Sequence, residues 1–274
     1  MSNPFPLTLG PLRSAMELTL HTHYAARIWQ GRPAGEEKSG IISLNGFVSL
    51  VNKITRGAEQ DDPYADLWMI RLHEKLEHSK DALTLIGDRL DELMGCLPPA
   101  IRVGENFNVH PVTVPLYINT QLGFLAVYLL IDYDNIVRRL LQAHRTALMG
   151  RRDMERWINA GGHVLRSLFG LAQQFKLSGT TREDFIANNA AAREAQERFG
   201  ELPADVLAGT RRSEFAPWII RRRVSDEGRP EAVEEEVGGG AEVGGAVEDA
   251  ADESRVNSST GLADKVMDSE HLGG

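Results

Sequence analysis

Two long segments with heptad spacing constrain the fold of this chain more than any other feature. In 62–94, apolar side chains recur at alternating steps of three and four residues, the pattern of a helix with one buried seam. Asp62 and Pro63 are typical of a helix start, and Gly95 is a typical stop. At about 1.5 Å per residue, this helix would be about 45–50 Å long. Its seam comprises Met69, Leu72, Leu76, Ser79, Leu83, Ile86, Leu90 and Leu93.

A second helix with the same spacing is expected over 121–148. Its seam comprises Leu122, Ala126, Leu129, Tyr133, Ile136 and Leu140. Two interpretations are open: the two helices pair as an antiparallel hairpin within the chain, or one of them pairs with a helix of a partner chain. Gly87 lowers helix propensity by up to about 1 kcal/mol relative to alanine, so it marks a bend or a close approach in the first helix.

The rest of the patterned region predicts shorter elements. Helices are expected over 151–159, 163–175 and 182–199, the first two separated by Gly161-Gly162. Two other segments, 16–22 and 112–118, alternate apolar and polar residues as strands do. The second contains Pro115, which disfavours a central strand. The sequence therefore predicts a mainly α fold with one or two short β-strands.

The charge of the chain is concentrated at one end. Residues 225–274 hold fourteen acidic and three basic residues, and the whole chain has a net charge of −9. Glycine runs interrupt the acidic blocks and few side chains there are large and apolar, so burial cannot offset the entropy lost on ordering. We expect a near-neutral helical body over 1–224 and a disordered acidic tail over 225–274.

Cysteine content and hydropathy indicate the cellular compartment of the protein. Cys96 is the single cysteine, which excludes an intramolecular disulfide and favours a reducing compartment. No apolar run reaches the length of about 20 residues that spans a bilayer, and the N-terminus lacks the pattern of a signal peptide. We expect a cytoplasmic protein without membrane contact, with Cys96 buried as a small apolar side chain.

The sequence carries no motif of a familiar enzyme. It contains no GxxxxGK[ST], GxGxxG, GxSxG or HExxH pattern, and its histidines are scattered. Asp132 and Asp134 stand two apart on an expected helix and so point to different faces, which does not suit an acid–base pair. We expect no catalytic activity, no metal site and no cofactor.

An arginine-rich stretch favours nucleic-acid binding. Seven arginines fall between 138 and 166, with only two acidic residues among them. Because arginine forms bidentate contacts with phosphate, Arg138, Arg139, Arg151 and Arg152 are candidates to position the phosphates of double-stranded DNA. The alternative is that these are ordinary solvent-facing residues, some of them paired with acids of neighbouring helices.

The segment 16–22 offers a second kind of contact with DNA. As a strand it would project Glu17, Thr19 and His21 from one face, and a two-stranded ribbon of such strands can enter a major groove. The alternatives are a plain edge strand or the start of a helix that runs into Trp29. The candidate contacts near the groove are Thr19, His21, His23 and Arg27.

Several short patches of the sequence, taken together, resemble those of a known protein family. They are Leu12-Arg13-Ser14, Leu18-Thr19-Leu20-His21-Thr22, Trp29-Gln30-Gly31-Arg32, Asp61-Asp62-Pro63-Tyr64-Ala65-Asp66, Leu122-Gly123, Leu168-Phe169-Gly170 and Gly200-Glu201-Leu202-Pro203. With these patches, residues 10–220 resemble a family of proteins encoded by bacterial integrating conjugative elements. That family is similar to the AcaB-type transcriptional activators of conjugative plasmids, which are dimeric ribbon-helix-helix DNA-binding proteins.

The resemblance implies a homodimer that binds double-stranded DNA, with ribbon strands in the groove and longer helices supporting the pair. We therefore expect a DNA-binding regulator of transfer genes in an integrating conjugative element. Either 16–22 or 112–118 supplies the ribbon, and the first is favoured because it contains no proline. The alternative function is a non-catalytic scaffold of the conjugation machinery, which binds partner proteins through the seam of 62–94.

Overall fold

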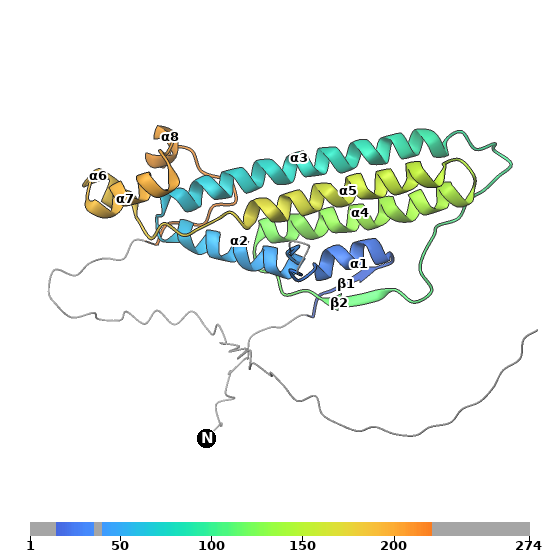
Figure 1. Cartoon of the computed structure of the whole chain (residues 1–274), viewed down its shortest axis with the longest axis horizontal. Coiled ribbons are helices and arrows are strands. Elements are labelled where there is room, and N and C mark those ends of the chain that lie inside the picture. Colours follow the sequence, from blue (N-terminus) through green and yellow to red (C-terminus); the bar gives the residue numbers. More distant parts are fainter. Residues whose placement is uncertain (1–14, 36–39, 221–274) are drawn as a thin grey trace, which may run out of the picture. The chain divides into compact units, whose positions relative to one another are not determined.

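The computed structural model describes residues 15–35 and 40–220 (Figure 1). In chain order, the elements are β1 (Glu17–Leu20), α1 (His23–Gln30), α2 (Leu44–Glu59), α3 (Pro63–Met94), β2 (Val112–Pro115), α4 (Gln121–Arg145), α5 (Arg151–Ala172), α6 (Arg182–Ile186), α7 (Ala190–Phe199) and α8 (Ala204–Leu207). Among the described residues the fold is mainly helical with one two-stranded sheet, which confirms the predicted fold class. No helix in this part of the chain is long and apolar enough to cross a membrane. The expected acidic tail and its boundary at 224 lie outside the described residues.

The α3 helix forms over the length that the sequence predicts. Asp62 caps it by accepting from two backbone N–H groups of the first turn, and Pro63 occupies a position that needs no donor. The seam positions that are buried are Met69, Leu72, Leu76, Ser79, Leu83 and Leu90. Gly87 does not interrupt the helix, and no atom lies within 4 Å of the place where its Cβ would stand. The expected burial of Cys96 is wrong: it is exposed, because it lies beyond the last seam position.

Of the two open interpretations for α3 and α4, pairing within the chain is observed, but the helices run in parallel and do not form an antiparallel hairpin (Figure 1). Their C-terminal parts lie together, since Arg139 of α4 forms an ion pair with Asp91 of α3. The connection 95–120, which carries β2, is long enough to return the chain to the first end of the bundle before α4 begins. The antiparallel hairpin is formed by α4 and α5 instead, across the turn 146–150. Because the seam of α3 is buried in this packing, it offers no free surface for a partner helix.

The α5 helix is continuous where two helices were expected. Gly161 and Gly162 lie inside it because they pack against Tyr133 of α4. A Cβ at Gly161 would come within 2.9 Å of the Tyr133 ring, and a Cβ at Gly162 within 3.0 Å of its hydroxyl oxygen. Tyr133 donates a hydrogen bond of 3.1 Å to the carbonyl of Ile158, and burial raises the pKa of Tyr133 to about 12. The glycine pair therefore marks a close helix approach and not a helix break.

The α2 helix lies outside the segments that were predicted to be helical. Ser43 caps it by accepting from the N–H of Gly46 at 3.0 Å. Phe47, Val51 and Ile54 are fully buried against α3, α4 and α5. These side chains recur every three or four residues, so the helical period was present in the sequence and was missed.

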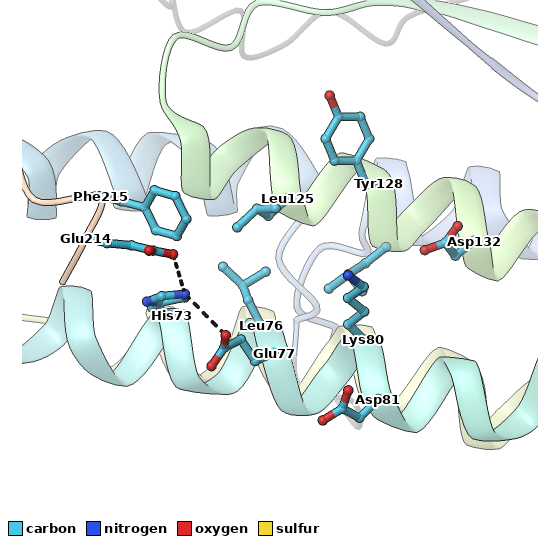
Figure 2. Close-up of a pocket in the computed structure, with 11 residues that line it drawn as sticks. His73, Leu76, Glu77, Lys80, Asp81, Leu125, Tyr128, Asp132, Glu214 and Phe215 are labelled. Carbon is cyan, nitrogen blue, oxygen red and sulfur yellow. Dashed lines mark ion pairs between the residues drawn. The ribbon is translucent and has the colours of Figure 1, made fainter.

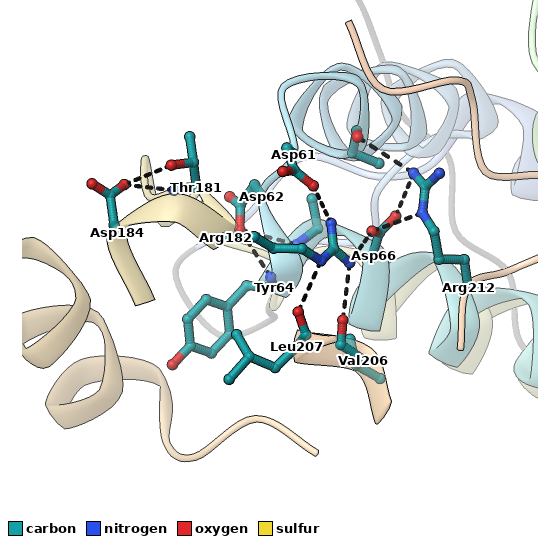
Figure 3. A network of polar contacts seen from close by, with 12 residues as sticks. Asp61, Asp62, Tyr64, Asp66, Thr181, Arg182, Asp184, Val206, Leu207 and Arg212 are labelled. Carbon is teal, nitrogen blue, oxygen red and sulfur yellow. Dashed lines mark hydrogen bonds and ion pairs between the residues drawn. The ribbon is translucent and has the colours of Figure 1, made fainter. Parts of the chain in front are cut away.

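Buried charges hold the segment after α5 against the start of α3 (Figure 3). Arg182 donates to Asp66 at 2.6 Å, to Asp61, and to two backbone carbonyl oxygens of α8. Arg212 contacts both carboxylate oxygens of the same Asp66, which is fully buried. Because burying an unpaired charge is costly, this complete pairing is what allows the charges to lie inside the fold. The network places α8 and the beginning of α6 at the N-terminal end of α3.

The expected helix 182–199 is divided into α6 and α7. Thr181 and Asp184 have the spacing of a capping box, and the box is present: the N–H of Thr181 donates to Asp184 at 2.7 Å, and this bond holds the pKa of the Asp184 carboxyl below its usual range. Asn188 then adopts the left-handed region with φ of 48°, and Asn189 caps α7. The division occurs because asparagine tolerates the left-handed conformation and is also a good N-cap.

Candidate nucleic-acid interface

Both segments that were predicted to be extended join in one antiparallel ribbon within the chain. β1 and β2 pair so that Thr19 lies opposite Thr113. Leu18 and Leu20 are buried, which turns Glu17 and Thr19 to solvent because side chains alternate along a strand. The outward polar face predicted for the first segment is therefore confirmed at these two positions. The helical alternative also holds in part, since α1 begins at His23 and only two residues separate it from the end of β1.

A buried carboxylate of α4 fixes the junction between β1 and α1. Asp134 accepts from the N–H groups of His21 and Thr22 at 2.9 Å each, and from the hydroxyl of Thr22 at 2.5 Å. Thr22 is also the N-cap of α1, where its hydroxyl accepts from the N–H of Ala25 at 3.2 Å. This carboxylate clamp fastens the ribbon and the first helix to the bundle. As predicted, Asp132 points to a different face, where it lines another pocket.

The predicted contact residue His21 belongs to a stack of side chains that joins the ribbon to α4. Its ring centroid is 5.1 Å from that of Phe107, and the guanidinium of Arg138 lies 4.7 Å from the same Phe107 ring. The backbone N–H of Asn108 donates to Nδ1 of His21 at 3.2 Å. Nδ1 is therefore an acceptor, and in the neutral ring Nε2 carries the proton and is a donor. Pattern reasoning did not find Phe107 and Asn108, because they lie in an irregular segment.

Three predicted groove contacts line one shallow groove beside the ribbon: His21, His23 and Arg27. His23 is the first residue of α1 and Arg27 follows one turn later, and both are exposed. Asn108 closes the groove on the side of the irregular segment. Thr19 does not line this groove but stands on the solvent face of the adjacent strand. The structure thus brings three of the four residues together and leaves the fourth on a neighbouring surface.

The four arginines that were predicted to position phosphates differ in their surroundings. Arg139 and Arg151 each form an ion pair with a carboxylate of the chain. Arg138 stacks on Phe107, and its buried Nε has no hydrogen-bond partner within the described part. Arg152 is exposed, and among the described residues its side chain has no ion-pair partner. The alternative of surface residues paired with acids therefore applies to two of the four.

A separate pocket between α3, α4 and the segment after α8 carries charges of both signs (Figure 2). Nε2 of His73 lies 3.6 Å from a carboxylate oxygen of Glu77 and 3.3 Å from one of Glu214. Burial raises the pKa of Asp132, and the positive charge of Lys80 acts against this rise. Across residues 15–35 and 40–220, no group of three or more potential ligand side chains is placed to hold a metal ion. The pocket thus offers paired charges of opposite sign.

A β-ribbon clamped to a helical bundle, with arginines and histidines beside it, defines a ribbon-bearing helical protein. The model of the family described as transcriptional regulator AcaB matches residues 8–220, and the chain belongs to that family. The predicted resemblance to AcaB-type regulators is confirmed, and the protein is a transcription regulator. The solved structure of selenomethionine-containing AcaB from uropathogenic E. coli is similar at 14% identity, covering 72% of this chain and 98% of that one, with a TM-score of 0.47. No curated protein matches the chain.

Proposed function

We propose that this regulator binds double-stranded DNA as a homodimer and controls the transfer genes of an integrating conjugative element. The observation that carries the proposal is the clamped ribbon, whose outward threonines lie next to a groove lined by two histidines and an arginine. A ribbon of two strands fits the major groove, where hydroxyl groups can donate to and accept from base edges. Because Asp134 fixes the ribbon to α4, the reading surface would be rigid before DNA arrives.

Some residues of the interface would contact DNA bases, and others would contact phosphates. Thr19 and Thr113 stand directly opposite each other and would contact base edges, and Glu17 would accept from a cytosine amino group. Arg27 and Arg152 are exposed and have no carboxylate partner among the described residues, so they are free to bind phosphate. Arg139 and Arg151 would have to exchange their present partners for phosphate, and we assign them a smaller contribution.

A homodimer accords with the edges of the ribbon. Among the described residues the sheet consists of two strands, so each strand has one edge without a neighbouring strand. Such an edge is a template for pairing with another chain. Val109 and Val112 are exposed apolar residues at the beginning of β2, on the path into the ribbon. A second copy that pairs along such an edge would also double the DNA-contacting surface.

Binding of the full chain to labelled duplex DNA tests the proposal. DNA from upstream of the element's transfer genes is compared with a scrambled duplex across a salt series, by fluorescence anisotropy. We expect tighter binding to the native duplex and an affinity that falls steeply as salt rises. The double variant Thr19→Ala/Thr113→Ala should reduce the preference for native DNA by about 10- to 100-fold, because two base-edge contacts are lost.

Two further variants separate base contacts from phosphate contacts. Arg27→Gln/Arg152→Gln should weaken binding to both duplexes equally and should lower the slope of log affinity against log salt by about 2. Thr84→Ala is the control, because Thr84 is exposed on α3 and lies outside the proposed surface. If the native and scrambled duplexes bind equally weakly, the proposed function is wrong. If the threonine variant keeps the full preference for the native duplex, the ribbon is not the reading element.

A further inference from the structure

Among the residues that the structure describes, three cations and no acidic residue line a cavity of about 280 Å³ at the N-terminal end of α3. Its lining residues are Tyr64, Leu67, Trp68 and Arg71 from α3, Gln174 and Lys176 from the segment after α5, and Arg198 and Phe199 from α7. It shares no residue with the ribbon, the groove beside it or the arginines of α4 and α5. Figure 1 places α7 beside the start of α3, whereas the turn between α4 and α5 lies at the other end of the bundle.

Within 15–35 and 40–220, the three cations of this pocket have no counter-charge. Arg71, Lys176 and Arg198 are exposed, and none of them forms an ion pair with an acid of the described chain. Elsewhere on the same surface, Arg211 is paired with Glu74 at 3.0 Å. Like charges that lie close together without an acid between them repel one another. Binding of an anion would reduce this electrostatic repulsion.

Aromatic rings hold two of the cations in place. The guanidinium of Arg71 lies 5.4 Å from the centroid of Trp68, and that of Arg198 lies 5.2 Å from the centroid of Phe199. A guanidinium held by a ring face keeps its N–H donors at the edge of its plane, where they remain free for an oxyanion.

The walls of the pocket are fixed before any ligand binds. Tyr64 is buried, and its hydroxyl donates a hydrogen bond of 2.6 Å to the carbonyl of Gly200. Its ring also contacts Phe199, with centroids 5.3 Å apart. Trp68 meets Phe175 edge-on at 6.1 Å. Because the rings under the two arginines are held by other elements of the fold, the donors are positioned with little further loss of entropy.

We propose that this pocket is a binding site for a phosphate group, separate from the DNA-reading surface. Two guanidinium groups and one ammonium group match the charge and the several acceptor oxygens of a phosphate, and arginine contacts it bidentately. A cavity of about 280 Å³ admits a phosphate with a small organic group attached. Two sources carry this chemistry: a free phosphorylated small molecule, and the backbone of a nucleic acid that reaches this end of the bundle.

Calorimetric titration of the full chain with inorganic pyrophosphate tests the site directly. The variant Arg71→Gln/Lys176→Gln/Arg198→Gln should lose at least about tenfold in affinity, because it removes every charged donor of the pocket. The matched control is Lys53→Gln/Arg56→Gln/Arg193→Gln, which removes three exposed cations outside the pocket and changes the net charge equally. The control should bind pyrophosphate as the unsubstituted chain does, and all three proteins should melt at similar temperatures.

Titration of the same proteins with duplex DNA identifies the source of the phosphate. If the pocket variant also loses DNA affinity and salt dependence, the ligand is the nucleic-acid backbone; if DNA binding is unchanged, the ligand is a free phosphorylated molecule. The proposal is overturned if pyrophosphate does not bind and the pocket variant binds DNA normally. It is equally overturned if the control variant loses as much affinity as the pocket variant. Neither result depends on sequence-specific DNA reading, so the proposed function stands or fails separately.

Discussion

The same substitution at two aspartates of one helix should have very different effects on stability. Asp134 of α4 accepts three hydrogen bonds from the β1–α1 junction, whereas Asp132, two residues earlier, lines a pocket on another face. Asp134→Ala removes the clamp that fastens the ribbon to the bundle. Asp132→Ala removes the same chemical group from the same helix without touching the junction, so it is a matched control.

The structure sets the size of the expected difference. Without Asp134, the N–H and the hydroxyl of Thr22 lose their acceptor in a buried site, and a buried donor left unsatisfied costs about 1–3 kcal/mol. The N–H of His21 adds less, because it is only partly buried. The variant also no longer buries a carboxylate, and this offsets part of the loss. We therefore expect Asp134→Ala to lower the free energy of unfolding by about 3 kcal/mol. Burial raises the pKa of Asp132, so its ionised form does not stabilise the fold, and its substitution should change stability by less than about 0.5 kcal/mol.

Urea unfolding of both variants, followed by circular dichroism, measures the two free energies. Hydrogen exchange at the amides of β1 and α1 should also speed up in Asp134→Ala and stay unchanged in Asp132→Ala. In the DNA assay, Asp134→Ala should lose preference for the native duplex even where it remains folded. Equal unfolding midpoints for the two variants would refute the clamp.

Two other predictions concern α3, α4 and α5. Gly87→Ala should stabilise the protein by about 0.5–1 kcal/mol, because alanine has the higher helix propensity and its Cβ meets open space. Gly161→Ala should destabilise the protein by about 1–2 kcal/mol, because its Cβ would stand 2.9 Å from the Tyr133 ring. Urea midpoints measure both changes, and a stabilising Gly161→Ala would contradict the close approach. Tyr133 has its pKa raised to about 12, above its ordinary value of about 10, so the stability it contributes is complete below pH 10 and is lost as the pH rises toward 12. Tyr133→Phe should lower the free energy of unfolding by about 1 kcal/mol at pH 7, because the hydrogen bond to Ile158 is lost. The difference in stability between the two proteins should shrink above pH 10. A difference that stays constant with pH would contradict the raised pKa of Tyr133.

Local sequence signals determined the positions of several elements. The α3 helix lies within one residue of its predicted span, because its cap, its first-turn proline and its seam all act within a few residues of each other. The two extended segments appear as β1 and β2, and the capping box at Thr181 and Asp184 forms as the spacing predicts. The family patches likewise led to the AcaB-type regulators from sequence alone.

Other features depend on partners that are distant along the chain. Gly161 and Gly162 look like a helix break until the ring of Tyr133 is placed against them. The carboxylate of Asp134 has no visible role until β1 and α1 lie beside α4, more than one hundred residues later in the sequence. The phosphate pocket likewise draws its three cations from three separate segments.

The sequence by itself thus determined which segments are helical or extended and which family the chain resembles, because propensity, capping and heptad period act over a few residues. Only the tertiary structure decided that α3 and α4 run parallel, that the two strands pair with each other, and which charged groups form ion pairs across the bundle. These outcomes follow from how the 95–120 connection returns the chain and from which buried polar groups find partners across the bundle. Such pairings join residues far apart in the sequence, so no local pattern encodes them.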